Sequence, residues 1–429
     1  TKNLNVSLDL GGRIDNINQP TESVFNLTTF GVVEANPMAP VYNPDGSIYS
    51  SSTANNPIRY LGGSGLEKNR RRNLYSTLNL KYDLSDILKG LGLFATVSFD
   101  AYETFESTQT ASINSWNYDY DNLGVTDLND FTYSRYTTYA PLSDPSANQR
   151  NYYYNLNSYG GVSYKNRLGK HGVDARAFVR WYRNEFAGSD DTTRQAASAI
   201  RNLSYNGTLT YDFDNRYILT GNYSRMATDN FSPNNRWGDF WGVSGAWVIS
   251  SEPFMKNQKV VDYLKLRASF GKAGQSETGV GRYPYQSTYS TATGYGFGYN
   301  ATGIQGYAEA VIGNENSLWE VSKMLNVGLD WDLWNKKLYG SFDIWKEWRS
   351  NILVTRTNVP DEILGISQAK DSYGKVNSHG FELMLGHRNK IGKDFKYYIE
   401  GQLTFATNKI IDIDEVDPVV EWQRKAGHR

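Results

Sequence analysis

The sequence predicts an all-β fold, in the form of a transmembrane antiparallel β-barrel of the outer-membrane type. Three observations lead to this prediction: an excess of aromatic residues in a polar chain, apolar residues with a period of two, and links that alternate between short and long. Of the 429 residues, 14% are aromatic, with 32 Tyr and 11 Trp, yet the mean hydropathy is −0.58. Membrane barrels place Tyr and Trp in girdles at both lipid boundaries, so this composition favours a barrel over a soluble core.

The composition also excludes several classes of protein. The chain has no Cys, which rules out disulfide scaffolds, zinc ribbons and cysteine nucleophiles. Its net charge of −1 argues against a nucleic-acid partner, because such proteins normally present a basic surface. No apolar run approaches the roughly 20 residues of a membrane-spanning helix. If the chain lies in a membrane, it must therefore cross with strands.

The candidate strands alternate between apolar and polar residues. The segment Leu74–Leu84, for example, places Leu78 and Leu80 on one face and Asn79 and Lys81 on the other. This period of two excludes amphipathic helices, whose apolar positions recur at three and four residues. About thirteen segments qualify: Asn3–Leu10, Leu74–Leu84, Leu91–Tyr102, Tyr152–Tyr164, Val173–Trp181, Leu203–Phe213, Tyr217–Tyr223, Trp241–Ile249, Leu264–Phe270, Leu325–Leu333, Leu338–Ile344, Phe381–His387 and Phe395–Phe405.

The links between these segments differ systematically in length. Short links are expected near Ser85–Gly90, Lys165–Gly172, Asp214–Asn215, Trp334–Lys337 and Asn389–Asp394, with a somewhat longer one at Ser251–Asp262. Long links fall between them, at Thr104–Asn151, Ala187–Ile200, Asp229–Asp239, Lys272–Lys323 and Ser350–Val376. Outer-membrane barrels have short periplasmic turns and long extracellular loops, and this alternation is typical of them.

The domain organisation is expected to be a single barrel portion over residues 1–429, incomplete at both ends. Bacterial barrels close with an even number of strands, whereas about thirteen are found here. The last residues, Glu421–Arg429, are polar and do not end on a strand.

Six segments in the second half of the chain resemble a known family. They are Arg236–Phe254 (RWGDFWGVSGAWVISSEPF), Tyr263–Gln275 (YLKLRASFGKAGQ), Gly313–Asp330 (GNENSLWEVSKMLNVGLD), Gly340–Leu353 (GSFDIWKEWRSNIL), Ser372–Glu382 (SYGKVNSHGFE) and Trp422–His428 (WQRKAGH). In this order and spacing, they resemble the C-terminal half of the barrel in SusC/RagA-family TonB-dependent transporters.

The resemblance implies a 22-stranded barrel in the outer membrane of a Gram-negative bacterium, with a plugged lumen. It also implies TonB-dependent import of an oligosaccharide or a peptide, with a SusD-like lipoprotein acting as a lid on the cell surface. The plug domain is not recognisable in this chain, so contact with TonB is expected through the missing N-terminal region. The alternative is a passive porin or a structural or adhesive outer-membrane barrel.

Two groups of aromatic residues in the long links are candidates for contact with the substrate or the lid. Amphipathic rings anchor protein interfaces, and their faces also suit the C–H surfaces of sugars. The same rings could instead pack against one another. The candidates are Trp116, Tyr118, Tyr120, Tyr133 and Tyr136 in one link, and Tyr285, Tyr295 and Phe297 in another.

A basic cluster, Lys68, Arg70, Arg71 and Arg72, precedes the strand predicted at Leu74–Leu84. That strand runs down to a short link, so the cluster is expected near the extracellular rim. There it could contact outer-membrane lipid and lipopolysaccharide, whose phosphates Arg binds well. The alternative is a solvated basic loop.

No catalytic, metal or cofactor site is predicted. The four histidines, His171, His379, His387 and His428, have no metal-ligand spacing and no neighbouring catalytic motif. An enzyme is therefore not expected.

The polar strand positions carry both signs of charge, for example Lys265, Arg267 and Glu382, which favours a plugged lumen over a single-sign pore.

Overall fold

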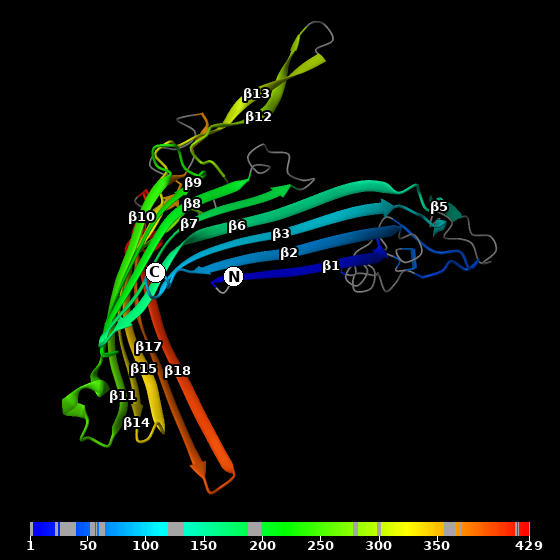
Figure 1. Cartoon of the computed structure of the whole chain (residues 1–429). Helices are drawn as coiled ribbons and strands as arrows, with labels where there is room; N and C mark the ends of the chain where they lie inside the picture. The colour runs from blue at the N-terminus through cyan, green and yellow to red at the C-terminus, as the bar shows by residue number, and fades with distance from the viewer. Residues whose placement is uncertain are drawn as a thin grey trace.

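The computed structural model describes residues 3–21, 25, 40–51, 56, 58–59, 65–118, 133–187, 199–277, 282–297, 302–355, 365–368, 370–416, 418 and 420–428. Within these residues the main element is one antiparallel sheet of thirteen strands, which curves and twists along its width (Figure 1). In order across the sheet, the strands are β1 (Leu4–Pro20), β2 (Leu66–Asp83), β3 (Leu91–Gln109), β6 (Ser146–Leu168), β7 (His171–Ala187), β8 (Ile200–Phe213), β9 (Tyr217–Thr228), β10 (Trp237–Val248), β11 (Val261–Gln275), β14 (Glu320–Leu333), β15 (Leu338–Val354), β17 (Asp371–Ile391) and β18 (Phe395–Asp412).

Each of the thirteen predicted segments coincides with one of these thirteen strands to within one residue at its ends or lies inside it, so the all-β fold class is confirmed. The strands are longer than predicted, however. Strand β2 begins at Leu66 rather than Leu74, and β17 begins at Asp371 rather than Phe381. The added residues are mostly polar on both faces and therefore lack the alternation on which the prediction depended.

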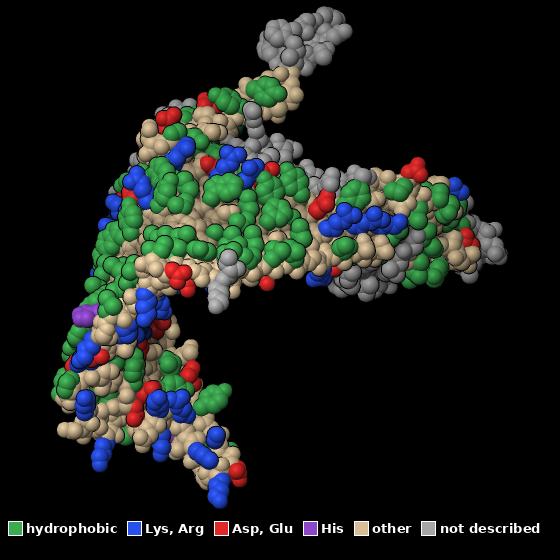
Figure 2. Space-filling view, viewed as in Figure 1, with side chains coloured by type: hydrophobic (Ala, Val, Ile, Leu, Met, Phe, Trp, Pro, Cys, Tyr) green, Lys and Arg blue, Asp and Glu red, His purple; other side chains and the backbone are tan. Residues whose placement is uncertain are grey.

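The pairing register sorts the side chains into two faces. In one row, Leu8 pairs with Leu78, which pairs in turn with Val97. In a second row, Leu209 pairs with Gly221, which pairs in turn with Val243. Because paired residues point to the same side of a sheet, these rows form one continuous apolar face. The opposite, polar face carries the alternate residues, such as Asn79 and Thr96. Figure 2 shows a wide apolar area over the curved sheet.

The links also divide between the two ends of the sheet. One end, the short-link end, holds the links 84–90, 169–170, 214–216, 249–260, 334–337 and 392–394. In the 214–216 turn, Asp214 and Asn215 have φ values of 56° and 53°, a conformation that these two residue types tolerate better than most. The other end, the long-link end, holds two small sheets as well as loops.

The two small sheets project from the long-link end. One is the hairpin of β4 (Ser115–Tyr118) and β5 (Tyr133–Thr137). The other consists of β12 (Thr288–Phe297), β13 (Thr302–Ile312) and the short β16 (Ser367–Gln368), and its β12–β13 hairpin extends away from the main sheet (Figure 1).

The main sheet is open in the described residues, with β1 and β18 as its edges. Among the residues that the structure describes, no buried apolar cluster lies at the centre of this sheet. The buried apolar cluster of the described residues, Phe231, Phe240 and Trp319 with Met226 packed against it, lies at the long-link end. No helix in the described part of the chain has the length and hydrophobicity needed to span a membrane.

Candidate functional site

The polar face carries an ion-pair network across three neighbouring strands. Arg267 in β11, Gly328 in β14 and Asp343 in β15 lie in one row of the register. The Arg267 guanidinium donates through Nη1 and Nη2 to both carboxylate oxygens of Asp343, at 2.6 Å each, and Nε contacts Asp330 at 3.2 Å. A bidentate pair of this kind is the strongest geometry for Arg and a carboxylate. The network therefore fixes β11 to β15 across the strand between them.

Gly328 makes this contact possible. A Cβ atom at that position would lie 2.6 Å from both Cζ of Arg267 and Oδ1 of Asp343. Any side chain would therefore collide with the ion pair. The sequence identified Arg267 as a polar-face residue but gave no sign of Asp330 and Asp343 as its partners, because the contact depends on the register of three strands.

Other hydrogen bonds on the polar face join side chains of different strands, either two uncharged groups or one charged and one uncharged group. The Thr96 hydroxyl donates to Asn79 at 2.8 Å, Arg180 Nε donates to Asn157 at 2.8 Å, and the Tyr339 hydroxyl donates to Glu400 at 3.1 Å across β17. The polar face thus presents donors and acceptors of both signs, as the sequence predicted.

The first group of candidate aromatics belongs to the β4–β5 hairpin. Trp116 and Tyr118 are in β4, Tyr133 and Tyr136 are in β5, and Tyr118 pairs with Tyr133 in the backbone register. Tyr120 lies outside the described residues. The hairpin therefore brings together four of the five aromatics that the sequence singled out in this link.

Trp116 is held within the loops. Its backbone N–H donates to the carbonyl of Ile48 at 2.8 Å, and its carbonyl accepts from the backbone N–H of Ser50 at 2.9 Å. The Arg135 guanidinium lies 4.8 Å from the centre of the indole ring. The Trp116 side chain is half-buried, so this residue packs against other loop residues.

A turn in the same loops is fixed by Asp45, in the sequence Asn43–Ser47. The Asp45 carboxylate accepts hydrogen bonds from the Ser47 hydroxyl, at 2.6 Å, and from the Ser47 backbone, at 2.9 Å. These two hydrogen bonds lower the pKa of Asp45, and the one from the Ser47 hydroxyl has the larger effect. Gly46 has a φ of 82°, which suits glycine in such a turn. The loop is therefore ordered by its own polar groups.

The second group of candidate aromatics lies in and before the β12–β13 hairpin. Tyr295 and Phe297 are in β12 and pair with Ile304 and Thr302. Tyr285 is half-buried before the strand, and its ring meets that of Tyr283 edge to face at 6.0 Å. Apart from Tyr285, which precedes β12, and Tyr120, the candidates thus belong to two separate small sheets at the long-link end.

Tyr285 belongs to a rim cluster that the sequence did not reveal. Arg282 binds the Asp229 carboxylate at 3.2 Å and the carbonyl of Ala199 at 2.9 Å. The Tyr283 backbone N–H donates to the Asn230 side chain at 3.0 Å. These contacts join three of the long links, which are distant in the sequence and meet only in the fold.

Two further exposed rings stand on the β12–β13 hairpin. Tyr289 in β12 is 67% exposed and Tyr307 in β13 is 77% exposed. Tyr289 pairs with Glu309, and Tyr307 pairs with Thr291, so the two rings lie diagonally on one face of the hairpin. Tyr307 was missed because residues 302–312 were read as part of a long link rather than as a strand.

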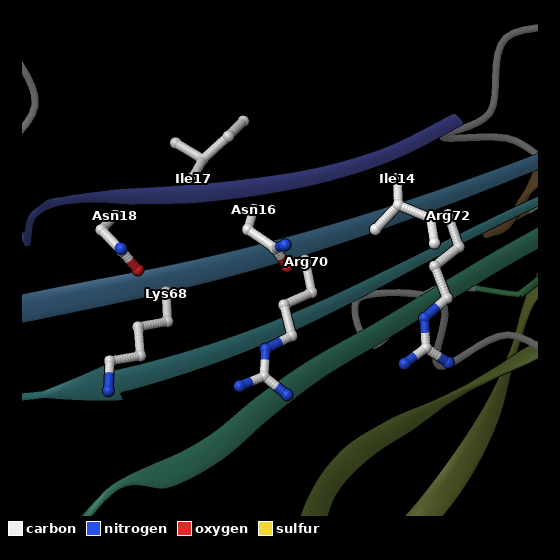
Figure 3. Close-up of a pocket in the computed structure, with 7 residues that line it drawn as sticks. All are labelled: Ile14, Asn16, Ile17, Asn18, Lys68, Arg70 and Arg72. Carbon is white, nitrogen blue, oxygen red and sulfur yellow. The ribbon is translucent and has the colours of Figure 1, made fainter.

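The basic cluster lies inside β2 rather than before it, contrary to the sequence prediction. Strand alternation divides its four residues. Lys68, Arg70 and Arg72 lie on the same face as Leu74 and are exposed, whereas Arg71 points to the polar face. Figure 3 shows the three side chains in a row on the same side of the sheet.

Aromatic residues line the apolar face near the short-link end. The Tyr217 and Trp247 rings are stacked, with centroids 6.4 Å apart. The Tyr217 hydroxyl and the Trp247 indole N–H donate to the buried Glu252, at 2.5 and 3.1 Å, and Arg216 binds the same carboxylate at 3.1 Å. Both hydrogen bonds lower the pKa of Glu252, and the one from Tyr217 has the larger effect. Rings with polar tips directed toward the strand ends match the expected girdle.

Comparisons with known proteins give consistent relatives. The TonB-dependent receptor P3 of Formosa agariphila is 29% identical over 275 residues, which are 62% of this chain and 26% of that protein. The TonB-dependent receptor SusC of Bacteroides thetaiotaomicron is 28% identical over 246 residues, 53% of this chain and 23% of that protein. The matched regions thus span only about a quarter of the length of these curated relatives. No family model matches the chain.

A solved structure has the same fold. The RagAB peptide importer in its closed-closed state matches with a TM-score of 0.71 and 19% identity, over 100% of this chain and 48% of the other. At that identity the match shows the fold alone. The strand order and the two faces agree with these matches: the chain is similar in sequence to TonB-dependent receptors, SusC among them, and its fold is that of part of a SusC/RagA-like outer-membrane β-barrel.

Proposed function

We propose that this chain is the barrel portion, residues 1–429, of a longer transporter that imports an oligosaccharide or a peptide in a TonB-dependent manner. The observation that carries the proposal is the sequence similarity to receptors named as TonB-dependent, P3 and SusC among them. The plug and the TonB-contacting segment belong, in this proposal, to the part of the transporter outside this chain.

The polar face supports a lumen that holds a plug. A passive pore is commonly selective through rings of charge of one sign. Here Arg267 is matched by Asp330 and Asp343, and the neighbouring rows mix amides, hydroxyls and charges. A wall of this kind offers hydrogen-bond partners to a folded plug and has no bias toward anions or cations.

The extracellular loops support a surface partner, which we propose to be a SusD-like lipoprotein. The β12–β13 hairpin extends from the rim and carries the exposed rings of Tyr289 and Tyr307 (Figure 1). Exposed tyrosines are favoured anchors of protein interfaces. The half-buried Trp116 is held by the loops, so its proposed role is to order the rim rather than to grip the partner.

The substrate class is proposed as oligosaccharide or peptide, and both fit aromatic loops. Tyrosine and tryptophan rings stack on sugars without needing charge, and they also bind peptides. The solved RagAB relative is described as a peptide importer, which is a statement about that protein.

The proposal is tested by growth on defined nutrients. The gene for the transporter is deleted in its host, and growth on a protein digest is compared with growth on a polysaccharide digest as sole carbon source. A second strain keeps the transporter but lacks TonB. Loss of growth on one of these digests in both strains is the expected result. Loss in the deletion strain with normal growth in the strain without TonB would instead show a passive barrel.

A further inference from the structure

Strand β2 places three basic side chains on the apolar face of the wall. Lys68, Arg70 and Arg72 continue the row that begins with Tyr82 and passes through Leu80, Leu78 and Leu74. These three side chains are exposed, and we call them the basic row. In a transmembrane barrel the apolar face contacts lipid, where a charge near the membrane centre is costly. The basic row must therefore lie at a polar level of the bilayer.

The length of β2 gives that level. Tyr82 stands at the short-link end, and ten residues separate it from Arg72. At a rise of about 3.4 Å per residue and a tilt of about 40°, ten residues cover roughly 26 Å of height. The apolar band of such barrels is about 25 Å tall. Arg72 thus lies at the outer headgroup boundary, and Arg70 and Lys68 lie beyond it.

Two other strands also place a cation on the apolar face, toward the long-link end. Arg225 in β9 lies eight residues from Tyr217, and Lys323 in β14 lies eight residues from Trp331. Figure 2 shows Lys and Arg side chains beyond the apolar area on the arm formed by the first strands. Eight residues cover roughly 21 Å of height by the same arithmetic, so Arg225 and Lys323 lie near the upper edge of the apolar band and below Arg72.

The surroundings of the basic row suit a phosphate. In β1, Asn18 pairs with Lys68 and Asn16 pairs with Arg70. The two amide side chains therefore lie beside the cations, whereas the Ile17 side chain points to the other side of the sheet (Figure 3). Together with Ile14, these residues line an open groove of about 530 Å³. Within the described residues, no hydrogen bond or ion pair joins a protein side chain to any member of the basic row.

One carboxylate lies close to the row. Glu103 in β3 pairs with Arg72, and both residues line a second depression with Arg70 and Phe105. Three cations against one carboxylate leave a net charge of about +2 on this part of the apolar face. The surplus is directed at the leaflet that faces the medium, so it attracts an anionic headgroup.

We propose that the basic row, with the amides of Asn16 and Asn18, binds the phosphate groups of the outer-leaflet lipid, lipopolysaccharide. The guanidinium groups of Arg70 and Arg72 form bidentate hydrogen bonds with phosphate oxygens, which Arg matches in geometry, and Lys68 adds a point charge. The site anchors the barrel in its leaflet. It goes beyond the proposed import function and does not depend on it.

The sequence supplies a matched control. Arg71 stands between two members of the basic row but points to the polar face. The intact transporter is purified in a nonionic detergent in two forms, Lys68→Gln/Arg70→Gln/Arg72→Gln and Arg71→Gln. Binding of purified lipopolysaccharide is measured by native mass spectrometry and by the shift in melting temperature. The triple variant should bind about tenfold more weakly or worse, and Arg71→Gln should bind like the unmodified protein.

Two comparison ligands and two single variants of Arg70 separate phosphate binding from other effects. Dephosphorylated lipopolysaccharide and inorganic phosphate serve as the two comparison ligands, and both should bind much more weakly than the phosphorylated lipid. If the triple variant does not fold, Arg70→Gln alone should show a smaller loss in the same direction, and Arg70→Lys should restore part of it. Equal binding by the triple variant and Arg71→Gln, or equal binding of the dephosphorylated lipid, would overturn the proposal. Tight binding of inorganic phosphate would also overturn it, because the site would then bind the free ion rather than the lipid.

Discussion

The Arg267 guanidinium reaches across strand β14 and binds both carboxylate oxygens of Asp343 in β15, at 2.6 Å each. The two residues are 76 positions apart in the sequence and are separated by a complete strand in the sheet. The contact exists because Gly328, between them, has no side chain. It ties three strands of the wall into one polar unit.

Replacing Gly328 with Ala should weaken this unit. The new methyl group would lie 2.6 Å from atoms of both partners, so either the pair must separate or the strands must shift. We expect a loss of about 1–3 kcal/mol in the free energy of unfolding, the usual cost of overpacking. The measurement is urea-induced unfolding of the intact barrel in lipid vesicles. Gly207→Ala in β8 is the control, because nothing lies within 4 Å of its Cβ position. Equal stability of the two variants would contradict this role of Gly328.

The ion pair should show coupling in a double-mutant cycle. Arg267→Gln leaves Asp343, only 13% exposed, without its cation, whereas the double variant with Asp343→Asn removes both charges. The double variant should therefore lose less stability than the two single losses added together, by about 1–3 kcal/mol. Unfolding midpoints of the four proteins provide the test. Additive losses would show that the two charges act independently.

The stability of the short-link end should depend on pH through Glu252. Its folded pKa lies below the ordinary value of 4.5, so the ionised form stabilises the fold above that pH. This stabilisation is lost as the pH falls through the folded pKa. The melting temperature of the unmodified protein should therefore fall more steeply below pH 4.5 than that of Glu252→Gln. Parallel curves for the two proteins would rule out this contribution.

The loop aromatics should divide into two kinds. Trp116→Ala removes a half-buried ring and its contact with Arg135, so it should destabilise the β4–β5 loops by about 1–3 kcal/mol and increase their cleavage by protease.

Tyr289→Ala/Tyr307→Ala removes two exposed rings and should leave cleavage unchanged. The same double variant should instead reduce co-purification of the proposed lipoprotein lid. Unchanged co-purification would remove the β12–β13 hairpin from the proposed interface.

The strands could be predicted because the membrane imposes a strict pattern on them. Where one face meets lipid, as at Leu78 and Leu80, each alternate residue is apolar and the period of two can be read directly. Beyond the lipid, the upper part of β2 has no such constraint. Its residues from Leu66 to Asn73 were therefore assigned to a loop, and the opposite orientations of Arg70 and Arg71 were missed.

The candidate site was predicted less completely than the wall. The aromatic groups at Trp116 and Tyr285 were found from their composition alone, and their proposed contacts with substrate or lid remain predictions. The partners of Arg267, and the cluster of Asp229, Arg282 and Tyr283, depend on long-range register and on three separate links. A single sequence contains no local signal for such contacts.

The strand count also fixes where the two ends of the sheet emerge. Thirteen antiparallel strands are an odd number, so β1 starts at the short-link end and β18 finishes at the long-link end. In the outer membrane, Leu4 and Asp412 therefore belong to opposite compartments, the periplasm and the cell exterior. The chain contains no Cys, so a thiol introduced as Asn3→Cys would be shielded from an impermeant label added to intact cells. A thiol introduced as Ile413→Cys would be open to it.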